Sequence, residues 1–182
     1  MNIDTSTKPP SGGPTKDEIL AISLFKLNLS PCDIFADLGC GTGRISREAA
    51  PLVKQVLAVD RRAEACNWTE KEAVASRISN ISVFNDDNRT FLSTVDHLDC
   101  AFVGGSQGLE EVIDALAKLK VRSLVINAVM LETANIAVSY LKKHGIFREV
   151  IMAQISRSYS IGSGIMFKPL DPVFIICGGS EC

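Results

Sequence analysis

The architecture of this chain follows from one run of residues, Ile34-Phe35-Ala36-Asp37-Leu38-Gly39-Cys40-Gly41-Thr42-Gly43-Arg44-Ile45. An apolar, strand-like stretch leads into three glycines at alternate positions, and a helix-like stretch follows. Glycines in such a turn let the backbone reverse sharply and come close to a ligand. Units built as strand, glycine turn and helix bind nucleotides in doubly wound α/β proteins. We therefore expect a nucleotide-type cofactor at this turn.

The spacing of the glycines argues against NAD and FAD. A dinucleotide-binding turn has the form G-x-G-x-x-G, and its third glycine lies where the helix packs against the strand. In this chain Gly43 comes one residue too early, and Arg44 occupies the expected position.

Length and composition predict one globular unit with a full core. The chain has 182 residues, of which 46% are hydrophobic, and a formal net charge of −2. Its charge therefore favours neither a nucleic-acid partner nor an anionic membrane. Six scattered cysteines without a C-x-x-C pair, and no signal-peptide pattern, predict a reduced, cytoplasmic protein. With only His97 and His144 available as imidazoles, we expect no metal site.

Beyond the glycine turn, strand-like runs alternate with helical patterns, which predicts a parallel sheet with helices on both faces. We expect strands at 34–38, 56–60, 81–85, 99–104 and 124–128, and helices at 64–79, 109–119 and 131–144, the last closed by Gly145. Two further strands, at 148–156 and 172–177, have no helix between them, which favours an antiparallel pair at one edge. The expected fold is thus a three-layer, doubly wound, Rossmann-like α/β fold with a seven-stranded, mostly parallel sheet and an antiparallel edge strand.

The first 14 residues differ in composition from the rest of the chain. Proline, glycine and serine are frequent there, so we expect residues 1–14 to form a flexible arm and residues 15–182 to form the domain. Thr15 and Glu18 have the spacing of a capping box, which predicts a helix that starts near Thr15 with this residue as its N-cap.

Ligands of open α/β sheets bind at the carboxyl ends of the strands. Asp60 ends the second strand, about 20 residues after the glycine turn, where a carboxylate accepts both hydroxyls of a ribose; its alternative role is to cap the next helix. After the third strand, Asp87 and Asn88 are expected to contact an adenine. The alternative is that these two residues only form a turn, because Asp and Asn are frequent in turns.

An acidic residue that opens a G-x-G-x-G turn resembles motif I of the class I S-adenosylmethionine-dependent methyltransferases. By this resemblance the turn holds the methionine part of S-adenosyl-L-methionine, and Cys40 and Thr42 offer mainly their backbone amides. A nucleophilic role for Cys40 is disfavoured, because no histidine partner can be placed beside it. The residues expected at the cofactor from this turn are Asp37, Gly39, Cys40, Gly41, Thr42 and Gly43.

Four further motifs narrow the family. They are Gly13-Pro14-Thr15, Gly104-Gly105-Ser106-Gln107-Gly108, Asn127-Ala128-Val129-Met130-Leu131-Glu132-Thr133 and Gly162-Ser163-Gly164-Ile165-Met166. Together with the glycine turn, from about residue 13 to residue 178, they resemble the decarboxylating precorrin methyltransferases of cobalamin biosynthesis. The resemblance implies methylation at C15 of cobalt-precorrin-6B, or precorrin-6, with loss of CO2 from the C12 acetate to give cobalt-precorrin-8.

The resemblance also implies a cofactor site and an assembly. It places Thr15, the turn at 39–43, Asp60 and Asn88 at the cofactor. The family's usual E-G-D-A sequence after the third strand is Asn85-Asp86-Asp87-Asn88 here, so the adenine contact departs from the pattern. A homotetramer, and association with a second precorrin methyltransferase, are expected on the same basis.

A tetrapyrrole substrate with many carboxylates needs cations and N–H donors around it. Candidates for these contacts are Arg44, Gln107, Arg157 and Lys168, although the three cations are equally explained as surface charges. The Gly104 to Gly108 loop offers amides to an anion, or forms only a tight turn. Glu132 orients a ring N–H or caps its helix. Methyl transfer to carbon depends mainly on positioning, so no acid or base is assigned, and the candidates for a catalytic role are Gly104, Gly105, Ser106 and Glu132.

Two alternatives of other classes stay open. Some tRNA methyltransferases share this core, but an RNA methyltransferase is expected to have a basic stripe or an added RNA-binding domain. The second alternative is a cofactor-binding subunit that supports a catalytic partner.

Overall fold

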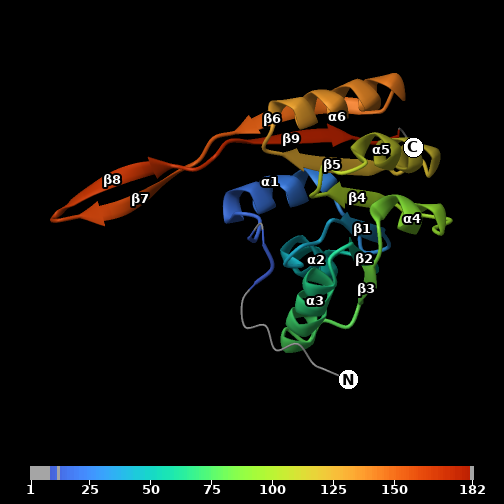
Figure 1. Cartoon of the computed structure of the whole chain (residues 1–182), viewed down its shortest axis with the longest axis horizontal. Coiled ribbons are helices and arrows are strands. Elements are labelled where there is room, and N and C mark those ends of the chain that lie inside the picture. Colours follow the sequence, from blue (N-terminus) through green and yellow to red (C-terminus); the bar gives the residue numbers. More distant parts are fainter. Residues whose placement is uncertain (1–8, 12, 181–182) are drawn as a thin grey trace.

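The computed structural model describes residues 9–11 and 13–180. A sheet flanked by helices forms the body, and a two-stranded hairpin projects from it (Figure 1). The elements are α1 (Asp17–Leu27), β1 (Ile34–Leu38), α2 (Arg44–Ala49), η1 (Ala50–Leu52), β2 (Gln55–Asp60), α3 (Ala63–Ala75), β3 (Ile81–Asn85), α4 (Asn88–Ser93), β4 (Cys100–Val103), α5 (Leu109–Lys118), β5 (Ser123–Ala128), α6 (Leu131–Lys143), β6 (Phe147–Ala153), β7 (Ser156–Ile161), β8 (Gly164–Pro169) and β9 (Val173–Gly178).

The sheet confirms the predicted fold class. Its seven strands lie in the order β3-β2-β1-β4-β5-β9-β6. The first five pair in parallel, and β9 pairs antiparallel with both β5 and β6. The predicted antiparallel pair at one edge is therefore present, with β9 inserted between β5 and the outermost strand β6. The strand order reverses between β1 and β4, and this switch point is where ligands bind in such sheets.

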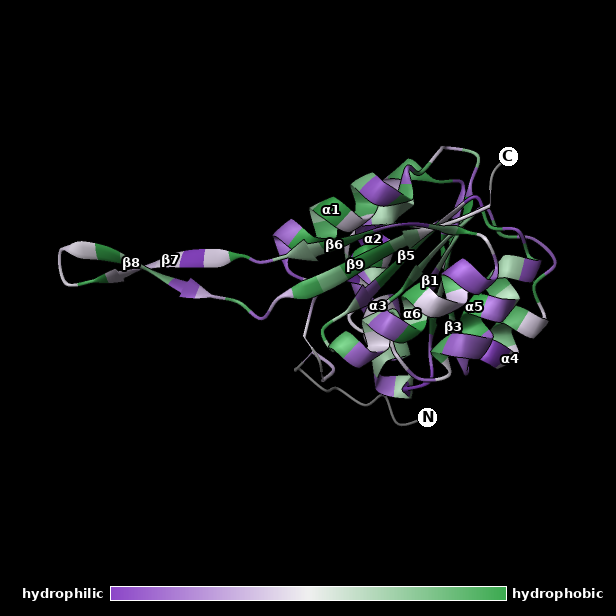
Figure 2. Ribbon diagram, turned by 90° about the horizontal axis from the view of Figure 1, so that it is seen from above, coloured by the Kyte–Doolittle hydropathy of each residue, from purple (hydrophilic) through white to green (hydrophobic). Residues whose placement is uncertain are grey.

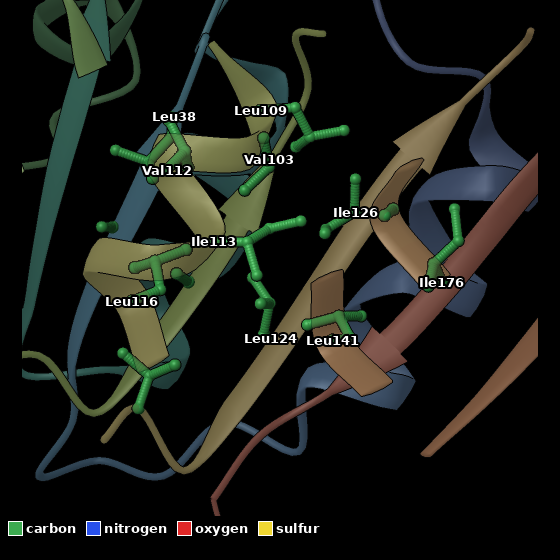
Figure 3. Close-up of a cluster of buried hydrophobic side chains, with 14 of the residues drawn as sticks. Leu38, Val103, Leu109, Val112, Ile113, Leu116, Leu124, Ile126, Leu141 and Ile176 are labelled. Atoms are coloured by element: carbon green, nitrogen blue, oxygen red, sulfur yellow. The ribbon is translucent and has the colours of Figure 1, made fainter. Parts of the chain in front are cut away.

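Successive residues of the central strands feed two separate cores on the two faces of the sheet. On β4, Ala101 and Val103 belong to one core, whereas Cys100 and Phe102 belong to the other. The first core lies under α4, α5 and α6, and ten of its side chains are labelled in Figure 3. The second core lies under α1 and α2. Figure 2 shows the apolar strands enclosed by helices that carry both hydrophilic and hydrophobic residues. Because both faces of the sheet are covered, its strands read as continuous apolar runs.

The start of the first helix differs from the prediction. The helix α1 begins at Asp17, its N-cap is Lys16, and no side chain caps it. The capping role predicted for Thr15 is therefore wrong, because this residue lies before the cap in the extended segment. Its carbonyl instead accepts a hydrogen bond from Arg44 Nη1 at 3.3 Å.

Three other elements were not predicted correctly. The helix α3 ends at Ala75 rather than at residue 79, and Arg77 follows in a left-handed conformation with φ 56°. The helix α4 is only 6 residues long, too short to show a helical period. The hairpin β7–β8 lies where no strand was expected. Every residue of its two strands is exposed, so the sequence shows no alternation of buried and exposed positions there.

The described part of the expected arm lies against the body of the protein. Pro10 is buried, and Ser11 accepts hydrogen bonds from Arg62. The remainder of the predicted arm, residues 1–8 and 12, lies outside the described residues.

Candidate functional site

Two adjoining cavities lie at the carboxyl ends of the parallel strands. The larger has a volume of about 370 Å³ and extends over the ends of β1, β2, β3 and β4; the smaller, of about 150 Å³, lies beside the glycine turn. Both are lined by Ser11, Gly39, Arg62 and Gly104. The site therefore forms where the order of the strands reverses, as the topology predicts.

Two glycines of the turn are required by close packing. Gly39 has φ +81°, and a Cβ on it would lie 3.3 Å from the backbone nitrogen of Gly105, so the turns after β1 and β4 approach closely. Gly43 has φ +65°, and a Cβ on it would lie 2.5 Å from Cγ2 of Thr69 on α3. The first glycine thus shapes the floor of both cavities, and the second lets α3 pack against the turn.

Several amides of the glycine turn are bonded within the protein. The N–H groups of Gly39 and Cys40 donate to the carbonyl of Val59, at 2.8 and 2.9 Å. The amide of Cys40 is therefore already used, contrary to the expectation that it is offered to a ligand, although the residue lines the smaller cavity. Burial raises the pKa of the Cys40 thiol, which keeps it protonated and agrees with the absence of a nucleophilic role.

Asp37 places a buried carboxylate beside the smaller cavity. Its side chain is almost fully buried, and Oδ2 accepts a hydrogen bond from Ser46 Oγ at 2.5 Å. The other oxygen, Oδ1, has no hydrogen-bond partner among the described residues. Burial raises the pKa of Asp37 to about 7, and the negative charge of Asp60 contributes to this rise. A buried acceptor without a partner suits a cationic amino group, which would supply both a donor and a compensating charge.

Asp60 ends β2 in contact with the glycine turn. Its Oδ2 accepts from the amide of Gly41 at 2.9 Å, and the guanidinium of Arg62 forms a two-pronged ion pair with both oxygens. Burial alone would raise the pKa of Asp60, but the donors of Arg62 and the Gly41 amide outweigh it and lower the pKa below its usual range. Arg62, not Asp60, is the N-cap of α3, so the alternative role for Asp60 as a helix cap is wrong.

Asp87 and Asn88 line the larger cavity at the end of β3. Asp87 is the N-cap of α4, and its Oδ1 accepts from the backbone nitrogen and Nε of Arg89 at 2.9 and 2.8 Å. These bonds lower the pKa of Asp87. The structure therefore shows the turn role for Asp87 that was one alternative. The adenine contact stays a prediction.

The structure gathers most of the residues predicted for the site, but four of them line neither cavity: Gly43, Glu132, Arg157 and Lys168. The larger cavity is lined by Gly104, Gly105, Ser106 and Gln107, and the smaller by Thr15, Asp37, Cys40, Gly41, Thr42 and Arg44. Glu132, in the first turn of α6, lines neither cavity and does not cap its helix, whose N-cap is Met130.

Arg157 and Lys168 lie opposite each other on the projecting hairpin rather than at the cavities. Arg157 forms an ion pair with Glu18 of α1, with Nη2 to Oε2 at 2.8 Å. Their predicted place near the strand ends is therefore wrong, because that placement took the segment between β6 and β9 for a loop that returns to the sheet.

Three charged residues of the site were missed. Arg61, Arg62 and Asp86 line the larger cavity, and Arg62 also lines the smaller one. A signal for Arg62 is present in the sequence: the spacing Asp-x-Arg occurs at the end of β2 (Asp60, Arg62) and again after β3 (Asp87, Arg89). At this spacing the arginine folds back onto the carboxylate in both places.

The family described as the precorrin methyltransferase domain matches residues 10–177. This chain belongs to that family. A relative from Methanosarcina acetivorans, named probable cobalt-precorrin-6B C(15)-methyltransferase (decarboxylating), is 43% identical over 94% of this chain and 96% of its own length.

Two solved structures support the same membership. The chain is similar to a precorrin-6Y C5,15-methyltransferase from Geobacter metallireducens, with a TM-score of 0.87 and 28% identity over 95% of this chain and 94% of the other. It is also similar to a structure described as precorrin 8w decarboxylase from Methanobacterium thermoautotrophicum, with a TM-score of 0.84 and 30% identity over 92% of each chain. The protein is thus a methyltransferase with the class I, Rossmann-like fold.

Two negative findings apply to the described part of the chain, residues 9–11 and 13–180. It contains no group of three or more His, Cys, Asp or Glu side chains placed to hold a metal ion. None of its helices has the length and apolar content needed to cross a bilayer.

Proposed function

We propose that this protein is an S-adenosylmethionine-dependent C-methyltransferase of cobalamin biosynthesis. It methylates C15 of cobalt-precorrin-6B, or of precorrin-6, and removes CO2 from the C12 acetate. The observation that carries the cofactor assignment is the pair of adjoining cavities, one beside the buried Asp37, whose Oδ1 has no partner among the described residues, and the other lined by Asp60 and by the residues after β3. The substrate assignment is supported by the names of the relatives, which the chain matches over nearly its full length.

In the proposed pose the cofactor extends from Asp37, at its methionine end, to Asp87 and Asn88, at its adenine end. Asp37 Oδ1 accepts from the α-ammonium group, Asp60 from the ribose hydroxyls, and Asp87 with Asn88 contacts the adenine. Thr15, Gly39, Cys40, Gly41, Thr42 and Gly43 surround the methionine part. When bound, the cofactor supplies an electrophilic methyl group on a sulfonium, so the protein has only to align this group with the attacking carbon and exclude water.

The substrate is proposed to lie beside the cofactor, over the ends of β4 and β5. These strands pair in parallel, with Val103 opposite Ile126, so the segments that follow them emerge side by side. The segment after β5 presents an exposed apolar surface formed by Val129, Met130 and Leu131, with exposed fractions of 68%, 58% and 57%. A flat macrocycle packs well on such a surface.

Polar groups at the same edge suit the substrate's carboxylates. Gln107 and the Gly105 amide lie on the β4 side, and Arg44 lies at the smaller cavity. The Gly104 amide already donates to the carbonyl of Leu38 at 2.9 Å. In the proposed reaction a bond forms between C15 and the methyl carbon while the methyl–sulfur bond breaks. The bond to the departing CO2 breaks with its electron pair entering the conjugated ring, and the methylene carbon left on C12 takes up a proton from solvent to become a methyl group. The protein's part in both steps is orientation, with the catalytic candidates Gly104, Gly105, Ser106 and Glu132 in supporting roles.

The deciding experiment incubates the full chain with S-adenosylmethionine and cobalt-precorrin-6B and follows the products by mass spectrometry. The expected product has gained one methyl group and lost one CO2; a product with neither change contradicts the proposal. Asp60→Ala is expected to weaken cofactor binding by roughly 10- to 100-fold, the range for hydrogen bonds to a charged group. Glu48→Ala, on the exposed side of α2, serves as the control.

The same experiment separates the alternatives. Cofactor binding without turnover, restored by adding a second precorrin methyltransferase, would favour the role of a non-catalytic subunit. Retention of bulk tRNA at low salt would favour RNA methylation, which the acidic pI of about 5.7 disfavours. A cytoplasmic location belongs to the proposal, and the free state of Cys32, Cys40, Cys66, Cys100 and Cys177 supports it.

Self-association through the projecting hairpin is also part of the proposal. The hairpin projects from the body of the protein (Figure 1). It carries large apolar side chains with high exposure, among them Ile165 at 71% and Phe167 at 68%. A two-stranded hairpin on its own is only marginally stable in water, and exposed strand edges readily pair with another chain. A second copy of this chain offers the same apolar strands and edges. We therefore infer that hairpins of neighbouring copies pack together in a homo-oligomer. The family resemblance implies that this oligomer is a tetramer.

A further inference from the structure

The carboxylate of Asp60 has its acceptor positions filled by the protein itself. Oδ1 accepts from the backbone nitrogen and from Nε of Arg62, both at 3.0 Å. Oδ2 accepts from the amide of Gly41 at 2.9 Å and from Nη2 of Arg62 at 3.1 Å. An ionised carboxylate offers about four lone-pair directions, so these four donors occupy the capacity that a ligand would need.

Arg62 is held from its other side by the segment before the first helix. Its Nη1 donates to the carbonyl oxygen of Ser11 at 3.0 Å and to Ser11 Oγ at 3.1 Å. The guanidinium therefore bridges Asp60 and Ser11, and it lies at the junction of the two cavities, since it lines both. A planar guanidinium that matches a carboxylate with two parallel bonds makes the strongest kind of side-chain ion pair.

The donors on Asp60 differ in how readily they can leave. The amides of Gly41 and Arg62 belong to the backbone, at the glycine turn and at the N-cap of α3, so they stay in place while the fold is intact. The two side-chain donors of Arg62 leave by rotation about side-chain bonds. A ribose can therefore donate its two hydroxyls to Asp60 only if it displaces the guanidinium of Arg62.

We propose that Arg62 sets the affinity of the site for its cofactor by competing with the ribose hydroxyls for Asp60. Cofactor binding then displaces the guanidinium, breaks its two bonds to Ser11 and frees the Pro10–Ser11 segment from the junction of the cavities. Breaking the Arg62–Asp60 ion pair offsets part of the binding free energy of the cofactor. The observed affinity is therefore lower than the affinity of the same site without this ion pair. The inference rests on the proposed function only in requiring that the ligand at Asp60 carries a ribose.

The test is a titration calorimetry measurement of S-adenosylhomocysteine binding to the full chain, since this ligand binds without turnover. Arg62→Met keeps the length of the side chain and removes its donors. We expect the dissociation constant of this variant to be lower than that of the wild type by roughly two- to fivefold, the range for loss of one partly exposed ion pair. Arg62→Lys, which has one ammonium group and cannot form the fork, is expected to lie between them.

Salt provides a second readout that a purely structural role would not change. Raising the ionic strength weakens a partly exposed ion pair, whereas S-adenosylhomocysteine has no net charge at neutral pH. Binding to the wild type is therefore expected to tighten about twofold between low and high salt, and binding to Arg62→Met is expected to stay constant.

Two comparisons separate direct competition from other effects. Arg77 is exposed and lines neither cavity. Arg77→Met thus removes the same charge away from the site, and its dissociation constant is expected to change less than twofold. Ser11→Ala removes one bond to Arg62 and is expected to tighten binding slightly in the wild type, but to have no effect in the Arg62→Met background, because the two residues act as one unit.

The outcomes are distinct. Unchanged or weaker binding by Arg62→Met and Arg62→Lys, in proteins with a normal unfolding transition, overturns the inference and leaves the proposed function intact. Wild-type protein that binds no S-adenosylhomocysteine at all overturns both.

Discussion

Ser46 and Asp37 share a buried hydrogen bond of 2.5 Å that satisfies one carboxylate oxygen of Asp37 and leaves the other without a partner. The glycine turn separates the two residues in sequence, and α2 brings the serine back over β1. The site therefore contains, before any ligand binds, a buried group whose ionised form is poorly solvated. The ionised carboxylate is expected to lower the stability of the ligand-free protein and to strengthen the binding of the cofactor's ammonium group.

The first prediction concerns pH. Burial raises the pKa of Asp37 to about 7, so between the ordinary pKa of an aspartate and this value the folded protein holds a proton that the unfolded chain does not. The stability of the folded protein thus falls as the pH rises through this window, and the loss is complete above it. Asp37→Asn removes the charge, and we expect this variant to be more stable than the wild type at pH 8 by roughly 2 to 4 kcal/mol.

Thermal unfolding at pH 5 and at pH 8 checks this prediction. The advantage of Asp37→Asn is expected to be large at pH 8 and small at pH 5, and S-adenosylhomocysteine binding is expected to weaken in the variant at both. An equal difference in unfolding temperature at the two pH values would show that the charge of Asp37 is not the cause.

The second prediction concerns Gly43, where a Cβ would lie 2.5 Å from Cγ2 of Thr69 and where φ is +65°. Gly43→Ala is expected to destabilise the fold by about 2 to 4 kcal/mol, the sum of a left-handed backbone and an overpacked contact. Gly145→Ala is the matched control, because Gly145 has a similar φ of +68° and nothing within 4 Å of the added Cβ. It is expected to cost only about 1 to 2 kcal/mol.

Denaturant unfolding of the two alanine variants separates backbone strain from steric overlap. Adding Thr69→Ala to Gly43→Ala removes the clashing methyl group and is expected to recover part of the loss. Equal losses at Gly43 and Gly145 would mean that the contact with α3 contributes nothing.

The sequence predicted those parts of the fold that repeat a pattern over several residues. Strands buried on both faces read as apolar runs, and the glycine turn with Asp60 located the site at the carboxyl ends of the strands. Asp60 and the turn are indeed in contact, through the bond from the Gly41 amide.

The errors have physical causes. Arg62 was missed because its role depends on a side chain that folds back onto Asp60; the Asp-x-Arg spacing is compatible with such a contact but does not require it. The hairpin was missed because its strands are exposed on both faces, so no alternation of polar and apolar residues marks them. Arg157 and Lys168 were predicted at the site because the segment that contains them was taken for a loop beside the sheet rather than a projecting hairpin.

The third prediction concerns the hairpin. Ile165 and Phe167 lie two residues apart on β8, so their side chains share one face of the strand. Ile165→Asp combined with Phe167→Asp places charges on that face and is expected to shift the protein from an oligomer to a smaller species, measured by light scattering after size-exclusion chromatography. Phe25→Asp on α1, where Phe25 is 79% exposed, is the control and is expected to leave the mass unchanged. An unaltered mass in the double variant would place the oligomer interface elsewhere.

The last prediction concerns the apolar surface after β5. Met130 and Leu131 are more than half exposed, and they follow β5, which pairs in parallel with β4; the loop after β4 lines the larger cavity. If the macrocycle packs there, Met130→Lys removes the burial of one large apolar side chain, worth about 1 to 2 kcal/mol. We expect kcat/KM for the tetrapyrrole to fall by roughly 5- to 30-fold, while the dissociation constant of S-adenosylhomocysteine changes less than twofold. Val74→Asp on α3 is the control, because Val74 is 77% exposed and lines neither cavity. Because a general loss of folding would lower cofactor affinity together with kcat/KM, only the split between the two measurements supports a substrate surface, and parallel losses would argue against it.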